Sequence, residues 1–291
     1  MTYPLSVCVF IKDCFKGGFC LFESMAGLLP LTNDFIVMDL GSTDGTLEAL
    51  KTIESKNNKV KVIRGEFYHQ DASVFADLAN DLIAQCAHDN VLYYQADEIW
   101  HENLLLRMNQ RLLKGDFDLS FWRIQYRENF QIVKWFPHLV HRVGQKGSFS
   151  FVGDGMTTDR TWDAKICSQY DGSYFPKWGN MGQDGIKPFV HDMITDISMV
   201  GGFLENIPDR RRMHAPFWHE EPTIEGQPIN EWMGVQRQNG NWFMINTPYN
   251  LPKILHYHVG KTKYRLRPNL LQALCENTTE RLVYGSEKLV C

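Results

Sequence analysis

Two aspartates in this sequence follow apolar segments that have the length of buried strands. Asp39 ends the segment FIVMD, and Asp97 follows the segment VLYYQA. In an open α/β sheet, ligands bind beyond the C-terminal ends of the strands. A single aspartate there is equally a turn former or a helix cap. Because parallel strands end at one edge, two such aspartates favour a ligand site, and we predict that Asp39 and Asp97 share one crevice.

The elements that must hold these aspartates alternate over the first hundred residues. Apolar runs of strand length alternate with segments of helical periodicity, such as the stripe of Phe75, Leu78 and Leu82. Such alternation predicts a parallel sheet with right-handed crossovers. The predicted strands are 5–11, 35–39, 59–64 and 91–95; the predicted helices are 19–29, one capped by Thr43 or Asp44 that runs to about 55, and one that begins at Asp71.

The second half of the chain differs in composition and in hydrophobic pattern. Longer strands of mixed polarity are predicted at 118–127 and 132–143, and the following hundred residues are rich in Gly, Pro, Trp and Asp. We predict three regions: 1–115 as an α/β half, 116–267 as a second half of the same domain, and 268–291 as a C-terminal helical extension. Within them, helices are predicted at 194–205 and 228–238, a strand at 254–259, and a helical, peripheral segment at 268–289.

The composition excludes several classes of protein. The chain has 291 residues, a net charge of −4 and seven cysteines, none of them in a CxxC pair. A zinc site or a disulfide framework is therefore not expected, and a reducing, cytoplasmic compartment fits best. No segment has the length of a membrane span. The compact basic cluster 210–212 does not by itself predict nucleic-acid binding, because a solvated loop has the same composition.

Four strings of the sequence resemble a known family. SVCVFIKD, IVMDLGSTDGT, FADLANDLI and VLYYQADEIWHE look like the successive motifs of family-two glycosyltransferases with the GT-A fold, over roughly residues 5–115. The resemblance implies an α/β, Rossmann-like mixed sheet flanked by helices, with an irregular elaboration on the acceptor side. In such a fold, residues 1–115 would be the nucleotide-sugar-binding half, and residues 116–267 would be the acceptor-side half with the metal-histidine strand. It also implies that Asp39 accepts a hydrogen bond from a nucleotide base, commonly uracil. The loop that includes Ile11, Lys12 and Asp13 would border that base, and Asn80 matches a position where the family often has an asparagine.

The acidic metal motif of the family departs from its usual form in this chain. The family has Asp-x-Asp, whereas this chain has Gln95-Ala96-Asp97 followed by Glu98. Mg²⁺ and Mn²⁺ prefer hard oxygen ligands, so Asp97 is the predicted metal ligand. Gln95 would contact ribose or a neighbouring ligand, and Glu98 would support Asp97. The residues predicted to bind the donor nucleotide are Ile11, Asp13, Asp39, Gln95, Ala96 and Lys261.

A late histidine is the second predicted metal ligand, also by resemblance. The segment LHYHVG resembles the family's His-Tyr-Gly segment, with His256 the closer match, although His258 would share its face of a strand. Two strand histidines with ordinary hydrogen bonds are the structural alternative. Lys261, Lys263 and Arg265 would then meet the leaving diphosphate, or form a solvated basic tail.

Inverting sugar transfer also needs a base that takes the proton of the attacking hydroxyl. Asp154, which lies between two glycines, is the preferred candidate, and Asp192 is the next. Glu220 and Glu221 are further candidates. Any of these carboxylates is also compatible with a surface or turn role. His191-Asp192 lacks the Gly-x-Ser-x-Gly elbow of a hydrolase.

The sequence therefore predicts a metal-dependent inverting glycosyltransferase that moves a sugar from a nucleotide diphosphate, with UDP favoured, to an acceptor hydroxyl. The acceptor could be a glycan, a protein or a modified nucleic acid. A sugar-nucleotide nucleotidyltransferase is a rival, although only Lys16-Gly17-Gly18 echoes its glycine-rich loop. A binding module that keeps the nucleotide pocket without catalysis is a second rival. A dinucleotide-binding oxidoreductase is set aside, because no Gly-x-Gly-x-x-Gly follows the first strand.

Overall fold

The computed structural model of the chain describes residues 4–69, 73–100, 102–127, 132–134, 138–152, 157–160, 165–166, 194–196, 242–244 and 266–284. Its elements are, in chain order, β1 (Leu5–Ile11), α1 (Cys14–Gly17), α2 (Leu21–Leu28), the 3-10 turn η1 (Leu29–Leu31), β2 (Asp34–Asp39), α3 (Thr46–Glu54), β3 (Val60–Arg64), α4 (Val74–Ala84), β4 (Asn90–Tyr93), β5 (Glu98–Ile99), α5 (Glu102–Leu113), β6 (Leu119–Arg127), β7 (Ile132–Lys134), β8 (His138–Gln145), β9 (Phe149–Val152), β10 (Thr157–Arg160), β11 (Lys165–Ile166), β12 (Ile194–Asp196), β13 (Trp242–Met244), α8 (Pro268–Glu276) and α9 (Glu280–Tyr284).

The main sheet is parallel on one side and antiparallel on the other. Its strand order is β13-β7-β6-β8-β4-β1-β2-β3. The strands β3, β2, β1 and β4 run parallel, as the alternation of the first hundred residues predicts. The strands β8 and β6 then pair antiparallel. This confirms the prediction of an α/β mixed sheet flanked by helices.

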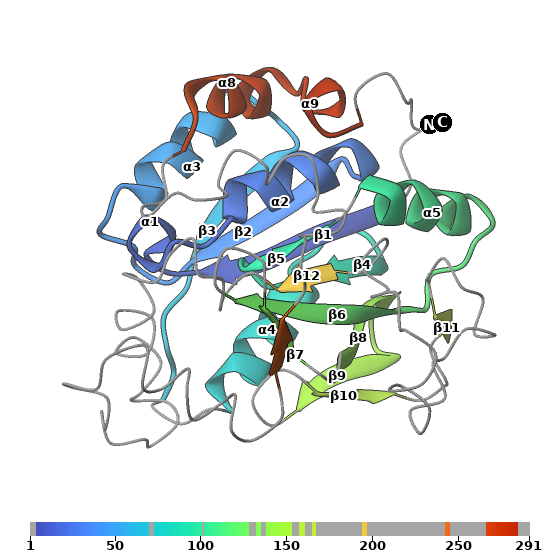
Figure 1. Ribbon diagram of the computed structural model, residues 1–291. Coiled ribbons are helices and arrows are strands. Elements are labelled where there is room, and N and C mark those ends of the chain that lie inside the picture. The colour runs from blue at the N-terminus through green and yellow to red at the C-terminus, as the bar shows by residue number, and fades with distance from the viewer. Residues whose placement is uncertain are drawn as a thin grey trace.

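Helices cover both faces of the sheet, and each face has its own apolar core (Figure 1). Helices α2, α3 and α5 contribute Phe22, Leu50 and Leu105 to the larger core. On the other face α4 and β9 contribute the smaller core, which includes Leu78 and Phe151. Strand β1 lies between the two cores and is almost entirely buried, as its sequence LSVCVFI, apolar except for Ser6, predicts.

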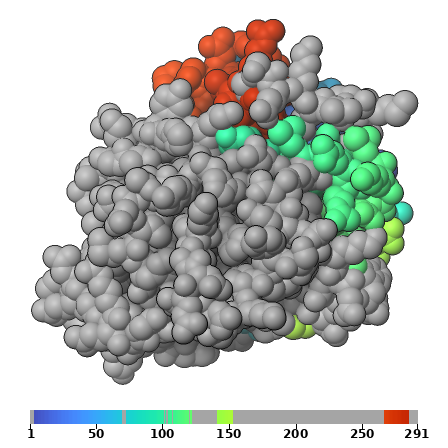
Figure 2. Space-filling view, turned by 45° about the vertical axis from the view of Figure 1, so that its right-hand side comes forward, coloured from blue at the N-terminus to red at the C-terminus, as the bar shows by residue number. Residues whose placement is uncertain are grey.

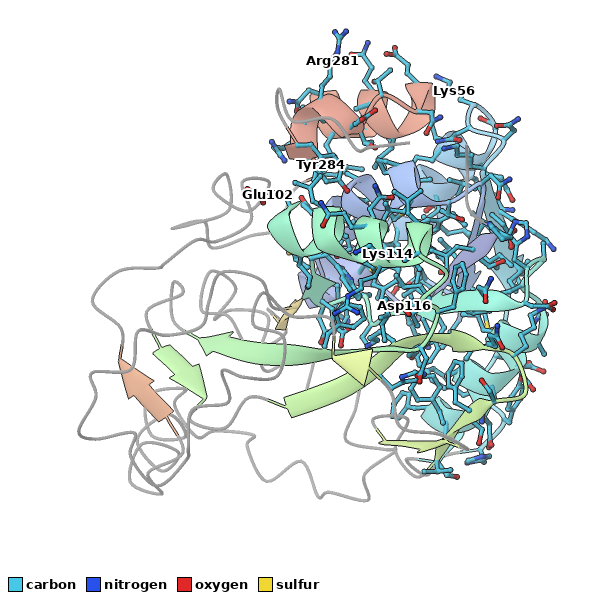
Figure 3. The ribbon with its side chains drawn as sticks, turned by 90° about the vertical axis from the view of Figure 1, so that its right-hand side faces the viewer. Lys56, Glu102, Lys114, Asp116, Arg281 and Tyr284 are labelled. Carbon is cyan, nitrogen blue, oxygen red and sulfur yellow. The ribbon has the colours of Figure 1, made fainter. Side chains whose placement is uncertain are left out.

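The C-terminal helices are part of the core, which corrects the prediction that they are peripheral. Leu270 and Leu274 of α8 are fully buried against α2 and α3. Tyr284 of α9 donates a hydrogen bond of 2.9 Å to the carbonyl of Gly27. Figure 3 shows Tyr284 on the inner side of this helix pair and Arg281 on its outer side. In Figure 2 the orange-red α8 and α9 lie on the surface above the green α5.

One prediction of local structure was wrong, and one helix was not predicted. Residues 194–196 form strand β12, which pairs with β5 and β6, and not the start of a helix. Within the predicted strand 132–143, residues 132–134 form β7 and residues 138–143 belong to β8, whereas residues 135–137 lie outside the described part of the chain. Helix α5 was not predicted, although its first and last turns contain the favourable Glu102 and Arg111. Among the described residues, no helix has the length and apolar character to cross a bilayer.

The buried leucines of α8 should therefore determine stability. We expect Leu274→Ala to lower the free energy of unfolding by about 2–5 kcal/mol, because it removes a fully buried side chain and leaves a cavity. Leu282→Ala in α9 is the matched control, since that leucine is 36% exposed. Its cost should stay below about 1 kcal/mol. Urea unfolding followed by circular dichroism measures both, and equal losses would contradict the buried packing of α8.

Candidate functional site

The register of β1 places the two predicted ligand loops at one edge of the sheet. Ile11 at the end of β1 is opposite Asp39 at the end of β2. On the other side of β1, Cys8 is opposite Tyr93, the last residue of β4. The loops that follow these strands therefore leave the sheet at the same edge, one carrying Asp39 and the other Asp97.

Asp39 forms the turn that follows β2. Its carboxylate accepts hydrogen bonds from the backbone N–H groups of Gly41 and Ser42, each at 3.1 Å to Oδ2. The side chain has no exposed surface. Gly41 has φ 84°, a conformation that glycine adopts without strain. In this structure Asp39 has the turn-forming role, and its contact with a nucleotide base stays a prediction.

Asp13 clamps the loop after β1 onto this turn. Its backbone N–H donates to Ser42 Oγ at 2.8 Å, and its Oδ1 accepts the N–H of Thr43 at 2.6 Å. Asp13 has φ 46°, in the left-handed region that few non-glycine residues occupy. Backbone strain of this kind persists where surrounding contacts hold it. The clamp thus fixes the distance between the ends of β1 and β2.

Asp44 joins the starts of two helices. Its Oδ1 accepts the N–H of Thr46 at 3.0 Å, in the first turn of α3, and its Oδ2 accepts the N–H of Lys16 at 2.7 Å, in α1. The residue at the N-cap itself is Gly45, so neither predicted residue occupies that position. The Gly-Ser-Thr-Asp-Gly-Thr string, together with Asp13 and Asp39, therefore forms a network of hydrogen bonds at the sheet edge, which we call the hub.

Lys12 lies beside this hub. Its ammonium group lies 5.3 Å from the centre of the Phe67 ring, which belongs to the loop after β3. A cation over an aromatic face is attracted by the ring quadrupole, and this attraction favours one position of the side chain. Lys12 therefore supplies a fixed positive charge next to the loops that carry Asp13 and Asp39.

The loop after β4 carries the predicted donor and metal residues. Gln95, Ala96 and Asp97 are half-buried. The Glu98 carboxylate turns back and accepts the N–H of Gln95 at 3.1 Å, while the N–H of Glu98 donates to the carbonyl of Gln95 at 2.9 Å. These two bonds close the turn that contains Asp97.

Glu98 is also held by a residue that the sequence interpretation missed. Arg142 Nε donates to Glu98 Oε2 at 2.9 Å and Nη2 donates to Oε1 at 2.5 Å, and neither side chain has exposed surface. The Arg142 guanidinium lies 5.7 Å from the centre of the Tyr93 ring. Burial raises the pKa of the Tyr93 phenol above its ordinary value, although the charge of Arg142 opposes that shift. The signal in the sequence was weak, because Arg142 lies in a strand of mixed polarity, HLVHRVGQ.

Asn80 has a structural role. Its amide donates to the carbonyl of Phe151 at 2.9 Å and accepts the N–H of the same residue at 2.8 Å. Both polar groups of the side chain are therefore used to hold β9 against α4. Phe151 is three residues before Asp154, so Asn80 fixes the start of the segment that leads to the preferred base.

The remaining predicted site residues lie outside the described part of the chain and stay predictions. They are Asp154, Asp192, Glu220, Glu221, His256, His258, Lys261, Lys263 and Arg265. Among the residues that are described, no three His, Cys, Asp or Glu side chains group as a metal site. Asp97 is therefore the one predicted metal ligand that the structure includes.

Comparisons with known proteins give a limited result. No protein-family model matches the sequence, and no curated protein matches it. Among solved structures, residues 1–349 of S. aureus TarS align with a TM-score of 0.31 and 19% identity over 44% of this chain and 36% of TarS 1–349. A glucosyl-3-phosphoglycerate synthase from Mycobacterium tuberculosis, with Mn²⁺, UDP and glucosyl-3-phosphoglycerate, aligns with 0.30 and 18% over 43% and 44%. The mannosyltransferase PcManGT from Pyrobaculum calidifontis, with GDP-Man and Mn²⁺, aligns with 0.32 and 15% over 44% and 36%. Because these TM-scores and sequence identities are low, they do not determine a function, and the residues of this chain have to indicate it.

The clamp made by Asp13 gives a testable prediction. Asp13→Ala should lower the free energy of unfolding by about 2–4 kcal/mol, because it removes a charge-assisted hydrogen bond and strains the left-handed backbone. Asp13→Asn keeps an acceptor and tolerates that backbone conformation, so it should cost less than about 1.5 kcal/mol. Chemical denaturation of both variants makes the comparison. Equal losses would show that the Thr43 contact and the positive φ contribute little.

Proposed function

We propose that this chain is a metal-dependent glycosyltransferase that moves a sugar, with inversion, from a nucleotide-diphosphate donor to an acceptor hydroxyl. UDP is the favoured nucleotide. The acceptor is a hydroxyl of a glycan, a protein or a modified nucleic acid.

One observation carries this proposal. The parallel pairing of β2, β1 and β4 brings the hub of the Gly-Ser-Thr-Asp-Gly-Thr string and the turn that contains Asp97 to the same edge of the sheet. In the proposal, the hub and Lys12 receive the nucleotide, while Asp97 faces the diphosphate. These two loops carry the strings that resemble the family-two glycosyltransferase motifs, so topology and motif support the same interpretation.

A divalent ion is compatible with the residues at this edge. Mg²⁺ is often held by one or two carboxylates together with substrate phosphates and water, and Asp97 supplies one carboxylate. Glu98 is committed to Arg142 and Gln95, so it is not a second ligand. In the proposal His256 completes the protein ligands. The bound ion would supply positive charge against the leaving diphosphate.

The proposed reaction has a simple balance of bonds. The acceptor oxygen attacks the anomeric carbon, the bond from that carbon to the diphosphate oxygen breaks, and the diphosphate leaves with the electron pair. The hydroxyl proton passes to a carboxylate. Asp154 is the preferred base and Asp192 the alternative. Asn80 supports the former choice because it holds the strand that leads to Asp154.

The rival nucleotidyltransferase fits the described residues less well. Lys16 and Gly17 lie in the short helix α1, not in an extended phosphate-binding loop. A Cβ atom on Gly17 would lie 2.4 Å from the Phe19 ring, so this glycine is explained by packing. The non-catalytic binding module differs from the enzyme in one measurable respect, which is metal-dependent hydrolysis of a UDP-sugar.

Asp97→Asn tests the proposed metal ligand. A nucleotide sugar with Mn²⁺ should raise the melting temperature of the wild type, since a ligand at 100 times its Kd stabilises by about 2.7 kcal/mol. The variant should keep its own melting temperature without ligand but lose the part of the shift that depends on manganese. A thermal-shift screen of nucleotide sugars with and without Mn²⁺ measures both effects.

Asp89→Asn is the matched control for that screen. Asp89 is exposed and precedes β4, at the opposite edge of the sheet. This control should respond to Mn²⁺ as the wild type does. Full manganese-dependent stabilisation of Asp97→Asn would refute the metal assignment, and no response of the wild type to any nucleotide sugar would refute the proposed function.

A further inference from the structure

The ion pair between Arg142 and Glu98 connects two parts of the sheet that are 44 residues apart in the sequence. Both side chains are fully buried, and the guanidinium forms two hydrogen bonds with the two carboxylate oxygens. This bidentate arrangement fixes orientation as well as distance. A lysine at position 142 would carry the charge but could not reproduce the paired geometry.

A β-bulge directs Arg142 toward this partner. Leu119 of β6 is opposite Val143, and the next residue, Ser120, is opposite His141. Arg142 is therefore the extra residue on β8, with no opposite residue on β6. Bulges of this kind change the direction of a side chain and are frequent beside functional sites. Without the extra residue, the alternation of β8 would direct position 142 differently.

Glu98 connects Arg142 to the turn that contains Asp97. Its carboxylate accepts the N–H of Gln95 on one side while Arg142 holds it on the other. Ser24 Oγ of α2 donates to the backbone carbonyl of Glu98. The turn is therefore fixed from β8 through the side chain of Glu98 and from α2 through its backbone.

Stability alone does not account for such a pair. Removing two charges from water costs much of what their attraction returns, and well-packed apolar side chains of similar size are often as stabilising or more so. What an apolar pair cannot supply is the acceptor for the Gln95 N–H. The pair therefore gives this turn a defined geometry that packing alone would not provide.

We propose that Arg142 is a positioning residue, which acts through Glu98 to hold the Gln95–Asp97 turn in the geometry required to bind the metal-bound diphosphate of the donor. This rests on the proposed function. The nucleotide base is received at a different place, by the hub and Lys12. Loss of Arg142 should therefore weaken metal-dependent steps much more than metal-free binding of the nucleotide, to which Gln95 and Ala96 contribute only part of the predicted contacts.

The decisive variant replaces both charges. Glu98→Leu with Arg142→Met should melt within a few degrees of the wild type, because it leaves no buried charge unpaired. Amide hydrogen exchange at residues 95–98 should become at least about tenfold faster, since the Gln95 N–H loses its acceptor and the turn loses its tie to β8. The kcat for hydrolysis of a UDP-sugar should fall about 100-fold, as a displacement of about 1 Å can cause. The concentration of Mn²⁺ for half-maximal rate should rise, and the Kd of UDP without metal should rise by less than about tenfold, because the hub and Lys12 are unchanged.

Two single variants complete the experiment. Arg142→Lys should recover part of the lost rate and of the exchange protection, and it serves as the test if the double variant does not fold. Arg111→Lys is the matched control, because Arg111 pairs with Asp116 at 3.2 Å in a half-exposed position. That control should leave every reading unchanged.

The outcomes separate the two proposals. Wild-type exchange at residues 95–98 in the double variant, or a rate per folded molecule equal to wild type, would overturn the role of Arg142. A uniform loss of metal-free UDP binding and of kcat would also overturn it, because that is the result of general destabilisation. If the wild type neither binds nor hydrolyses any nucleotide sugar, the proposed function fails, and the exchange experiment still decides whether Arg142 orders the turn.

Discussion

The position of β1 between two parallel neighbours is the constraint on which the site depends. Because β1 pairs with β2 on one side and β4 on the other, the loops after all three strands must leave the sheet at one edge. The strand can hold this place because its side chains are apolar on both faces and enter both cores. Residues far apart in the sequence, such as Asp39 and Asp97, are thereby brought to the same edge.

The two loops at this edge are stabilised in different ways. In the hub, Asp13, Asp39 and Asp44 are satisfied by backbone N–H groups of the hub itself and of the neighbouring loop. Such bonds can form wherever a turn exposes its backbone N–H groups. The conformation of the hub is therefore determined largely by its own residues and by the hydrogen bonds of Asp13. The turn after β4 instead depends on Arg142, a residue from a distant strand. One half of the candidate site is therefore local in origin, and the other is built by the tertiary fold.

This difference explains what the sequence could predict. The first four strands and the α4 helix follow from apolar periodicity, and the turn after Asp39 follows from its glycines and aspartates. The pairing of Glu98 with Arg142 could not be predicted. It requires the register of β8 and a one-residue bulge, which the hydrophobic pattern of the sequence does not indicate. Strand β12, which pairs with β5 and β6, was mistaken for a helix because three residues carry too little periodicity to be recognised. The burial of α8 was missed because its apolar stripe does not show that this helix packs against α2 and α3.

The packing of the last helices against the first has a consequence for biosynthesis. Gly27 accepts its hydrogen bond from a residue synthesised 257 positions later. At a usual elongation rate of ~5–20 residues per second, that interval lasts roughly 13–50 s. Throughout it, the outer surfaces of α2 and α3 have no native cover. The nascent chain must therefore leave the ribosome with apolar helix faces exposed, which makes it a natural client of chaperones until residue 284 emerges and the domain closes.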